Sequence, residues 1–386
     1  MPRLTLASLA AAALGLALVP LSGASTSASA DEGTVTMSGT AYEFNNVDQM
    51  LAGATIHVLE DDGLTATVAD DGTYSLQVPD HAEVTPYITK DGYGTIYLQT
   101  FSTDGQDLVN VNFQTPTLGV RDLLALVLGI DTDDAGYPAQ CAVVSTVSTK
   151  QVRGVTYDQF IKWGAHGVAG VTADITPEAG KRTYFNASVI PDASQTETSE
   201  DGGVVWSEVP AGDYTLSAHG AGSDWPDVHV KCADGRIVNA NPPWGLNQRA
   251  TTVPTKARAT WTTSRRGTPR LAGLTVGKVP HQVLPAAAVE HGETIDYRGV
   301  VTVTCSGGGC FAPLTTRGSM RKPVDLVKLL GPAAVKKLKP GRALEVSLAV
   351  PGYNARVDRW KIGKHGTPSR TTQCIPLGWS APQQTC

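Results

Sequence analysis

One stretch of the chain contains the side chains that could support hydrolytic chemistry. His219 stands two residues after Ser217 and five before Asp224, and His166 and His229 fall in the same stretch. A histidine beside a serine can take its proton and make it a nucleophile, and a carboxylate can orient the histidine. A hydrolase with a site around His219 is therefore one hypothesis.

The sequence motifs that usually accompany such chemistry are missing. No Gly-x-Ser-x-Gly elbow presents a serine nucleophile. No His-x-x-x-His or His-Glu-x-x-His spacing supplies a pair of metal ligands. Ser217 and His219 would share one face of a strand by simple alternation. We therefore predict that the protein is not an enzyme, with no catalytic residues and no metal ligands.

Acidic loops are the other candidate for a ligand. Residues 131–136 begin like a calcium loop, with acids at the first and third positions and glycine at the sixth. The pattern then fails, because Ala135 takes the fifth position and Ala142 takes the twelfth, where a bidentate glutamate is needed. We expect no cofactor. The alternative is a calcium ion at this loop, at residues 60–62 or at residues 70–71.

The first thirty residues predict export. Arg3 supplies a positive region, an apolar run follows, and Ala28-Ser-Ala30 is a cleavage signature before Asp31. No second apolar run follows, so we expect a secreted protein without a transmembrane span.

Six cysteines in an exported chain predict three disulfides. Fifteen pairings are possible. The expected module boundaries favour Cys141–Cys232, Cys305–Cys310 and Cys374–Cys386. Zinc binding by these cysteines is the alternative, but the CxxC-like pairs that it needs are missing.

Charge is distributed unevenly along the chain. Residues 31–135 contain 18 acids and two bases, Lys90 and Arg121, whereas residues 247–386 contain 6 acids and 21 bases. Such a basic tail predicts adhesion to an anionic cell-wall polymer. The alternatives are a solvated surface, or attraction between the acidic head and the basic tail. No interleaving of aromatic and basic residues suggests a nucleic-acid partner.

Two copies of one strand pattern organise the chain. Residues 196–218 predict two strands, with a turn at Asp201-Gly202-Gly203 and another at Pro210-Ala-Gly212. Residues 69–79 repeat the first part of this pattern, and each copy follows a matching strand, residues 52–56 in one and 169–173 in the other. This is the signature of an internal repeat.

These turns and strands resemble the carboxypeptidase regulatory-like, or prealbumin-like, family of β-sandwich domains. The resemblance implies an all-β fold of tandem β-sandwiches, prealbumin-like or Ig-like, with a few short helices. The fold is shared with starch-binding modules, which implies carbohydrate as a ligand. Residues 301–310, 338–344 and 372–378 are similar to a C-terminal module that recurs in secreted actinobacterial proteins.

The predicted organisation has six parts. They are a signal peptide (1–30), a first sandwich (34–117), a helical connector (118–137), a second sandwich (138–246), a linker (247–270) and a basic β module (271–386). The connector helix, residues 119–130, is expected to pack between the two sandwiches. A short helix is expected at residues 156–164, with Thr156 as a possible N-cap.

Two functions from different classes follow from these patterns. The first is a secreted, non-catalytic binding or adhesion protein whose partner is a polysaccharide or an anionic cell-wall polymer. Its candidate ligand-binding residues are His219, Trp225 and Trp244; the two tryptophans could lie in the core or at a rim, where they would stack on sugars. The alternative is a secreted hydrolase with its site in the second sandwich. The oligomeric state stays open.

Overall fold

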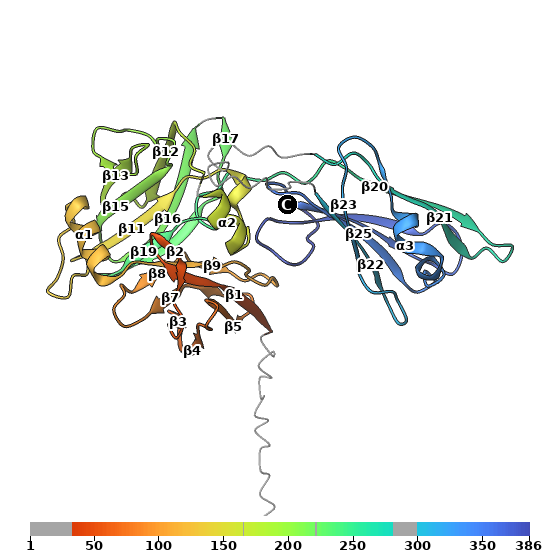
Figure 1. Cartoon of the computed structure of the whole chain (residues 1–386), viewed down its shortest axis with the longest axis horizontal. Helices are drawn as coiled ribbons and strands as arrows, with labels where there is room; N and C mark the ends of the chain where they lie inside the picture. Colours follow the sequence, from red (N-terminus) through yellow and green to blue (C-terminus); the bar gives the residue numbers. More distant parts are fainter. Residues whose placement is uncertain (1–32, 165, 221, 281–298) are drawn as a thin grey trace, which may run out of the picture. The chain divides into compact units, whose positions relative to one another are not determined.

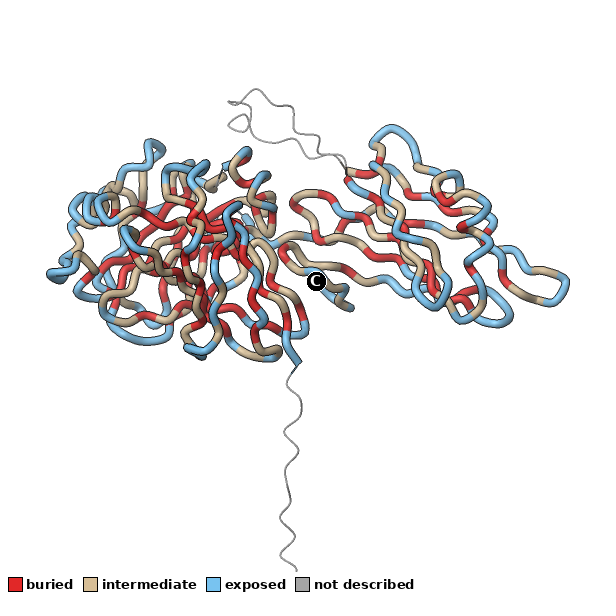
Figure 2. The backbone as a smooth tube through the Cα atoms, turned by 60° about the horizontal axis from the view of Figure 1, so that its bottom comes forward, coloured by how far each residue is buried: buried red, intermediate tan, exposed pale blue. Residues whose placement is uncertain are grey.

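The computed structural model describes residues 33–164, 166–220, 222–280 and 299–386, and the predicted signal peptide lies outside them. Strands dominate this part of the chain, together with three α-helices and one short 3-10 helix at Lys150–Val152 (Figure 1). Buried and exposed residues alternate along many of the strands, as expected when one face of each strand packs on a core (Figure 2). The predicted all-β fold of tandem sandwiches is confirmed.

Two facing sheets build the first module. One sheet consists of β1 (Thr34–Glu43), β2 (Asn46–Met50), β5 (Thr73–Pro79) and β10 (Phe113–Thr115). The other includes β3 (Thr55–Val58), β4 (Asp61–Thr67), β7 (Pro86–Thr89) and β8 (Ile96–Tyr97). A short pair, β6 (Glu83–Val84) and β9 (Phe101–Ser102), completes the module. Met37, Ile56, Ile88 and Phe113 meet in a core that excludes water.

The second module has the same plan. Its first sheet contains β11 (Cys141–Thr146), β13 (Lys181–Phe185), β14 (Pro191–Asp192), β15 (Gly203–Val209) and β19 (Ile237–Ala240). Its second sheet contains β12 (Val171–Thr176), β16 (Gly212–Gly220), β17 (Ser223–Asp224) and β18 (Val228–Cys232). Trp206, Leu216 and Val230 lie in the core between the sheets.

The internal repeat is visible in the strand pairing. β1 pairs antiparallel with β5 in the first copy, as β11 does with β15 in the second. β3 pairs antiparallel with β7 in the first copy, as β12 does with β16 in the second. The two Asp-Gly turns also match: Asp71 accepts a hydrogen bond from the backbone N–H of Thr73, and Asp201 accepts one from that of Gly203. The glycine of each turn has a positive φ, 81° at Gly72 and 76° at Gly202, where a side chain would be strained.

One sheet runs through both modules. In the described residues, nine strands follow the order β14-β13-β15-β11-β19-β8-β7-β3-β4. The junction is the parallel pair β8–β19, where Tyr97 stands opposite Val238. Trp244, from the end of the second module, lies in the core of the first, and the side chain of Gln99 accepts the N–H of Gly245. The two sandwiches therefore share hydrogen bonds and core contacts.

A third group of strands forms the C-terminal module. Its larger sheet runs β23 (Leu314–Arg317), β22 (Val300–Ser306), β25 (Ala343–Ala349), β26 (Ala355–Lys361) and β27 (Ser369–Ile375). The smaller one runs β20 (Ala257–Thr263), β21 (Pro269–Val276) and β24 (Val324–Asp325). Helix α3 (Leu326–Val335) packs into the shared core through Leu326 and Leu330.

The segment predicted as a linker, residues 247–270, differs in the structure. It contains β20 and the first residues of β21, which pair as a hairpin. The inward side chains of β20 are Ala257, Ala259 and Trp261. Two of these three are small, so the apolar alternation was too weak to indicate a strand.

Helix α1 (Leu118–Leu128) begins and ends as its sequence predicts. The side chain of Thr117 accepts the N–H of Val120, and Gly129 ends the helix in the left-handed conformation. The helix borders both sandwiches, because Arg121 lines a cleft with Thr55 and Lys90 of the first module. It is not enclosed between them, since the side that carries Leu123 and Leu126 is exposed, at 59% and 78%. Leu124 and Leu128 face the shared sheet instead, over residues Ala142, Val144, Val205 and Ile237.

Helix α2 (Tyr157–Trp163) confirms the short helix that was predicted after Thr156. The Thr156 side chain accepts the N–H of Gln159, and the Gln159 side chain accepts the N–H of Thr156. This reciprocal capping box satisfies two backbone donors that a helix start otherwise leaves unpaired.

The three expected disulfides are all present. They are Cys141–Cys232, Cys305–Cys310 and Cys374–Cys386. Cys141–Cys232 joins the start of β11 to the end of β18, so it links the two sheets of the second sandwich. Closing a loop with a sequence separation of 91 residues stabilises the fold by about 4.5 kcal/mol on an entropic model.

Side chains cover the edge strand β12 of the second module. The hydroxyl of Tyr184 accepts the N–H of Ala173, and Arg182 donates to the carbonyl of Ala173 at 2.6 Å. The N–H of Val171 donates to the hydroxyl of Thr198, and the N–H of Thr198 donates to the carbonyl of Val171. Backbone groups of Val171 and Ala173 that face away from β16 are therefore occupied.

Candidate functional site

The structure brings the predicted serine and histidine to one face of β16. Asp174 stands opposite Ser217 and Thr172 stands opposite His219, so these four side chains point away from the core. Asp174, Ser217 and His219 border a cleft of about 590 Å³ that is also lined by Glu178 and Arg182. We call the set Asp174, Arg182, Ser217 and His219 the His219 face.

The geometry of the His219 face differs from that of a catalytic triad. Two residues along a strand lie about 6.6 Å apart, whereas a serine and its base need contact within about 3.2 Å. Asp174 forms an ion pair with Arg182, and Asp224 forms one with Arg249. Within the described residues, neither carboxylate forms a hydrogen bond to His219.

The other two histidines, His166 and His229, do not line the cleft of the His219 face. The ring of His229 is 3.2 Å from the hydroxyl of Thr215. His166 lies in a loop before β12, and burial lowers the pKa of its imidazole below the ordinary value. No cluster of three or more His, Cys, Asp or Glu residues that could hold a metal ion occurs in residues 33–164, 166–220, 222–280 and 299–386.

The acidic loop after α1 uses its central carboxylate to fold the loop itself. Asp133 accepts hydrogen bonds from the N–H groups of Ala135 and Tyr137, at 2.9 and 2.8 Å. This is a turn stabilised by an aspartate side chain. In the same way, Asp71 caps the turn at residues 71–73.

Both candidate tryptophans lie in the core. Trp225 is 3% exposed, and its indole N–H donates to the carbonyl of Ser148. Trp244 is 4% exposed; it meets Phe101 and Trp379 edge to face and carries Arg153 over its ring. A sugar needs an exposed ring face to stack on, so neither tryptophan offers one.

A cationic hairpin is one basic surface of the C-terminal module. We use this name for β20, β21 and their turn, with Arg258, Arg265, Arg266 and Arg270. No acidic residue occurs from Asn247 to Pro280. Arg258 lies on the outer face of β20, and Arg270, opposite Thr262, lies on the same face. Arg265 and Arg266 are exposed in the turn.

A second basic turn lies against the tip of the cationic hairpin. A Cβ atom placed on Gly267 would be 3.3 Å from Nδ1 of His365, so the turns at residues 264–268 and 362–368 are in contact. Lys364 and His365 are both exposed. The sequence indicated the basic tail, but it could not show that Lys364 lies near Arg265 and Arg266, because the two turns are about 100 residues apart.

The first and second modules are also joined by an ion-pair network. Glu60 accepts two hydrogen bonds from Thr85 and pairs at 2.8 Å with Lys231, which also lies 3.2 Å from Glu83. Burial alone would raise the pKa of Glu60, but the hydrogen bonds from Lys231 and Thr85 outweigh it and hold the pKa below its ordinary value. Burial opposes the charge of Lys231 too, but Glu60 and Glu83 raise its pKa. This network orders the junction between the first and second modules.

The known proteins that resemble this chain and are described below are distant in sequence. No family model matches the chain, and no curated protein does. Among solved structures, a Streptococcal ancillary pilin is 11% identical, with 88% of this chain and 95% of that chain covered and a TM-score of 0.19. The shaft pilin SpaA of Lactobacillus rhamnosus GG is 12% identical, with 56% of this chain and 97% of that chain covered and a TM-score of 0.17.

The TIE protein of Bacillus anthracis is 10% identical over 86% of this chain, with a TM-score of 0.17; the chain spans 49% of that protein. TM-scores this far below 0.5 do not establish a common fold, so these likenesses identify neither a family nor a ligand. The described helices include none that is both long and apolar enough to cross a membrane.

Proposed function

We propose that the protein is an extracellular, non-catalytic binding protein that attaches to an anionic cell-wall polymer through its cationic hairpin. The observation that carries this proposal is the concentration of four arginines on an acid-free hairpin, in contact with a second basic turn. Exposed guanidinium groups on a protruding element can reach phosphates or carboxylates along a polymer without displacing any internal partner.

Two further observations support the proposal. Three disulfides are typical of proteins that fold in an oxidising compartment, which favours export. The His219 face lacks a serine–histidine hydrogen bond in the described residues, which favours binding over hydrolysis. Because Trp225 and Trp244 are buried, a charged polymer suits the surface better than a neutral polysaccharide held by aromatic stacking.

A retention experiment tests the proposal. Mature protein is applied to poly(glycerol phosphate), to neutral dextran and to isolated cell walls, across a salt series. We expect retention on the phosphate polymer and on walls that falls as salt rises, since contacts with phosphates release counterions. The double variant Arg265→Ser/Arg266→Ser should weaken retention and flatten its salt dependence.

The matched control removes two charges elsewhere in the same module. Lys336 and Lys337, after α3, are exposed, and Lys336→Ser/Lys337→Ser lowers the net charge by the same amount. An equal loss of retention in both double variants would show that only net charge matters. Stronger retention on dextran than on the phosphate polymer would favour a neutral polysaccharide, and turnover of esters or glycans abolished by His219→Ala would favour the hydrolase.

A further inference from the structure

The two bases of the acidic first part of the chain converge on one cleft. Residues 31–135 contain only Lys90 and Arg121 against 18 acids. Both line a cleft of about 630 Å³ beside β3, β7 and α1, which we call the Arg121 cleft.

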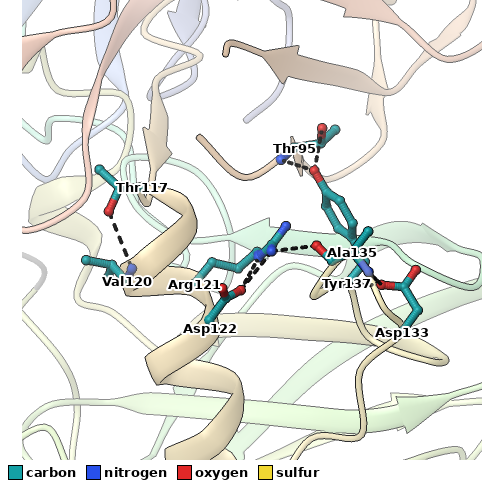
Figure 3. A network of polar contacts seen from close by, with 8 residues as sticks. All are labelled: Thr95, Thr117, Val120, Arg121, Asp122, Asp133, Ala135 and Tyr137. Atoms are coloured by element: carbon teal, nitrogen blue, oxygen red, sulfur yellow. Dashed lines mark hydrogen bonds and ion pairs between the residues drawn. The ribbon is translucent and has the colours of Figure 1, made fainter. Parts of the chain in front are cut away.

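Two nitrogens of Arg121 are held by hydrogen bonds, whereas its Nη1 forms none with the described residues. The side chain is 5% exposed; Nε and Nη2 donate to Asp122, and Nη2 also donates to the carbonyl of Ala135 at 2.7 Å (Figure 3). The guanidinium carbon lies 4.4 Å from the centre of the Tyr137 ring. Nη1 is buried and forms no hydrogen bond with any described residue. A buried donor on a charged group is costly to leave unpaired.

Lys90 has unused donors at the same cleft. It is half-buried, and Nζ donates to the carbonyl of Ala52 at 2.6 Å. An ammonium group has three donors, so two remain beyond this bond. Lys90 and Arg121 thus both bring unused N–H groups to the lining of one cleft.

The nearby acids are engaged elsewhere. Asp122 is used by Arg121, Asp133 caps its own loop, and Glu43 accepts the hydroxyl of Tyr93 at 2.8 Å. Asp91 is the one acid among the described lining residues of the cleft, and it is exposed. At physiological salt, charges more than about 8 Å away are largely screened. Asp122 pairs with Arg121 and Asp91 lines the cleft, so two acids balance the two bases, and the attraction for an anion comes from the unused donors of Lys90 and Arg121 and not from a net positive charge.

The rest of the lining suits a hydroxylated ligand. Thr55, Thr89 and Thr95 contribute hydroxyls, and Tyr93 and Tyr137 contribute phenols and flat ring surfaces. The hydroxyl of Tyr137 is 3.3 Å from both the N–H and the hydroxyl of Thr95, a long contact that can be exchanged for a better one. A volume of about 630 Å³ lies in the range of pockets that enclose small ligands.

We propose that the Arg121 cleft binds the carboxylate of an acidic saccharide. The carboxylate lies between Nη1 of Arg121 and Nζ of Lys90, and the sugar hydroxyls lie toward Thr55, Thr89 and Thr95. This site is separate from the cationic hairpin and does not depend on the polymer that the hairpin binds.

The test compares matched sugars on the full mature chain. D-glucuronate, D-glucose and D-glucose 6-phosphate are titrated by calorimetry, with amide chemical shifts followed by NMR. We expect glucuronate to bind at millimolar concentration, glucose to bind at least tenfold more weakly, and shifts to concentrate at residues 89–95 and 118–137. Lys90→Gln should weaken glucuronate binding about tenfold, since it removes a charged partner.

Three controls keep the outcome decisive. Lys181→Gln removes an exposed lysine that pairs with Glu208 in the second module and should change nothing. Arg265→Ser/Arg266→Ser should also leave glucuronate binding intact, which separates this site from the cationic hairpin. Glucuronate binding by Arg121→Gln is interpreted together with the melting temperature of that variant, because Arg121 also donates a hydrogen bond to the carbonyl of Ala135 and so stabilises the loop. Unchanged binding in Lys90→Gln, or equal binding of glucose and glucuronate, overturns the proposal, and tighter binding of glucose 6-phosphate overturns its carboxylate specificity.

Discussion

Asp358 occupies a position that water does not reach. Its side chain is 1% exposed and accepts hydrogen bonds from Arg370, Thr372 and the N–H of Ala257, with Arg356 3.2 Å away. These partners belong to β20, β26 and β27, so a single carboxylate joins the two sheets of the C-terminal module. Its removal would leave two guanidinium groups partly buried without their counter-ion.

The first prediction concerns this carboxylate. Asp358→Ala should lower the free energy of unfolding by about 3–5 kcal/mol, the usual effect of breaking a buried ion pair on one side. Urea denaturation followed by tryptophan fluorescence would measure it. Asp213→Ala, at an exposed site, is the control and should stay within about 0.5 kcal/mol of wild type. A similar small effect at Asp358 would contradict the role given to it.

The second prediction is a pH dependence set by Glu60. Because the folded protein lowers the pKa of this carboxyl, its contribution to stability is fully present above the ordinary value of 4.5 and is lost as pH falls through the lowered pKa. Glu60→Gln should therefore be less stable at pH 7 and lose less stability on acidification to pH 3 than the wild type does.

Urea midpoints at pH 7, 5 and 3 would measure this difference. Glu178→Gln, on the exposed side of the second module, is the control and should follow the wild-type curve. Parallel curves for Glu60→Gln and wild type would show that the Glu60–Lys231 pair contributes nothing to the pH dependence.

At the scale of elements, helix α1 presents two different apolar sides. Leu124 and Leu128 cover the shared sheet, whereas Leu126 is 78% exposed. Only the side with Leu124 and Leu128 loses apolar surface to the sheet on folding. Each Å² of apolar surface removed from water stabilises the folded protein by about 25 cal/mol. Composition alone does not distinguish the two sides, because the helix is apolar nearly all round.

The third prediction separates these sides. Leu124→Ser should lower the free energy of unfolding by about 1–3 kcal/mol, since it loses buried apolar area and places a hydroxyl against the sheet. Leu126→Ser is the matched control and should change stability by less than about 0.5 kcal/mol. Thermal melting of both variants would test the assignment, and a larger loss at Leu126 would reverse it.

The sequence predicted the features that depend on nearby residues. The Asp-Gly turns, the Thr156 cap and the strands around them follow from local chemistry, and the disulfides followed once module limits were drawn. The pairing of β8 with β19 joins residues about 140 positions apart and leaves no local pattern. The burial of Trp244 in the first core depends on the same long-range pairing. For the sites, residue types indicated the basic tail, but only the tertiary fold shows that Lys90 and Arg121 line one cleft.

At the scale of the whole molecule, the two sandwiches are expected to unfold together. They share one sheet, and Trp244 from the second module fills the core of the first, so neither is complete alone. Separate domains of one chain usually share only a limited interface and are joined by an exposed linker. These two sandwiches share a sheet and a core. The repeat therefore shows that the chain contains two similar arrangements of strands, but we expect that the two copies do not fold independently.

The fourth prediction follows from this shared core. Trp244→Ala should lower the stability of both sandwiches by about 3–5 kcal/mol, and hydrogen exchange at Ile88 in β7 and Val143 in β11 should accelerate together. The exposed variant Leu123→Ala is the control and should leave both protected. Residues 33–117 expressed alone should be poorly folded, and a stable, cooperatively melting fragment would contradict the prediction.

The covered edge of β12 has a consequence for crowding. A bare edge strand is a template on which another chain can add a strand, and adhesive proteins held close together on a surface meet that hazard at high local concentration. Here Tyr184, Arg182 and Thr198 already occupy backbone groups of Val171 and Ala173. A neighbouring copy therefore finds no row of free donors and acceptors along the first half of this strand, and packing many molecules side by side need not lead to amyloid-like growth from this edge.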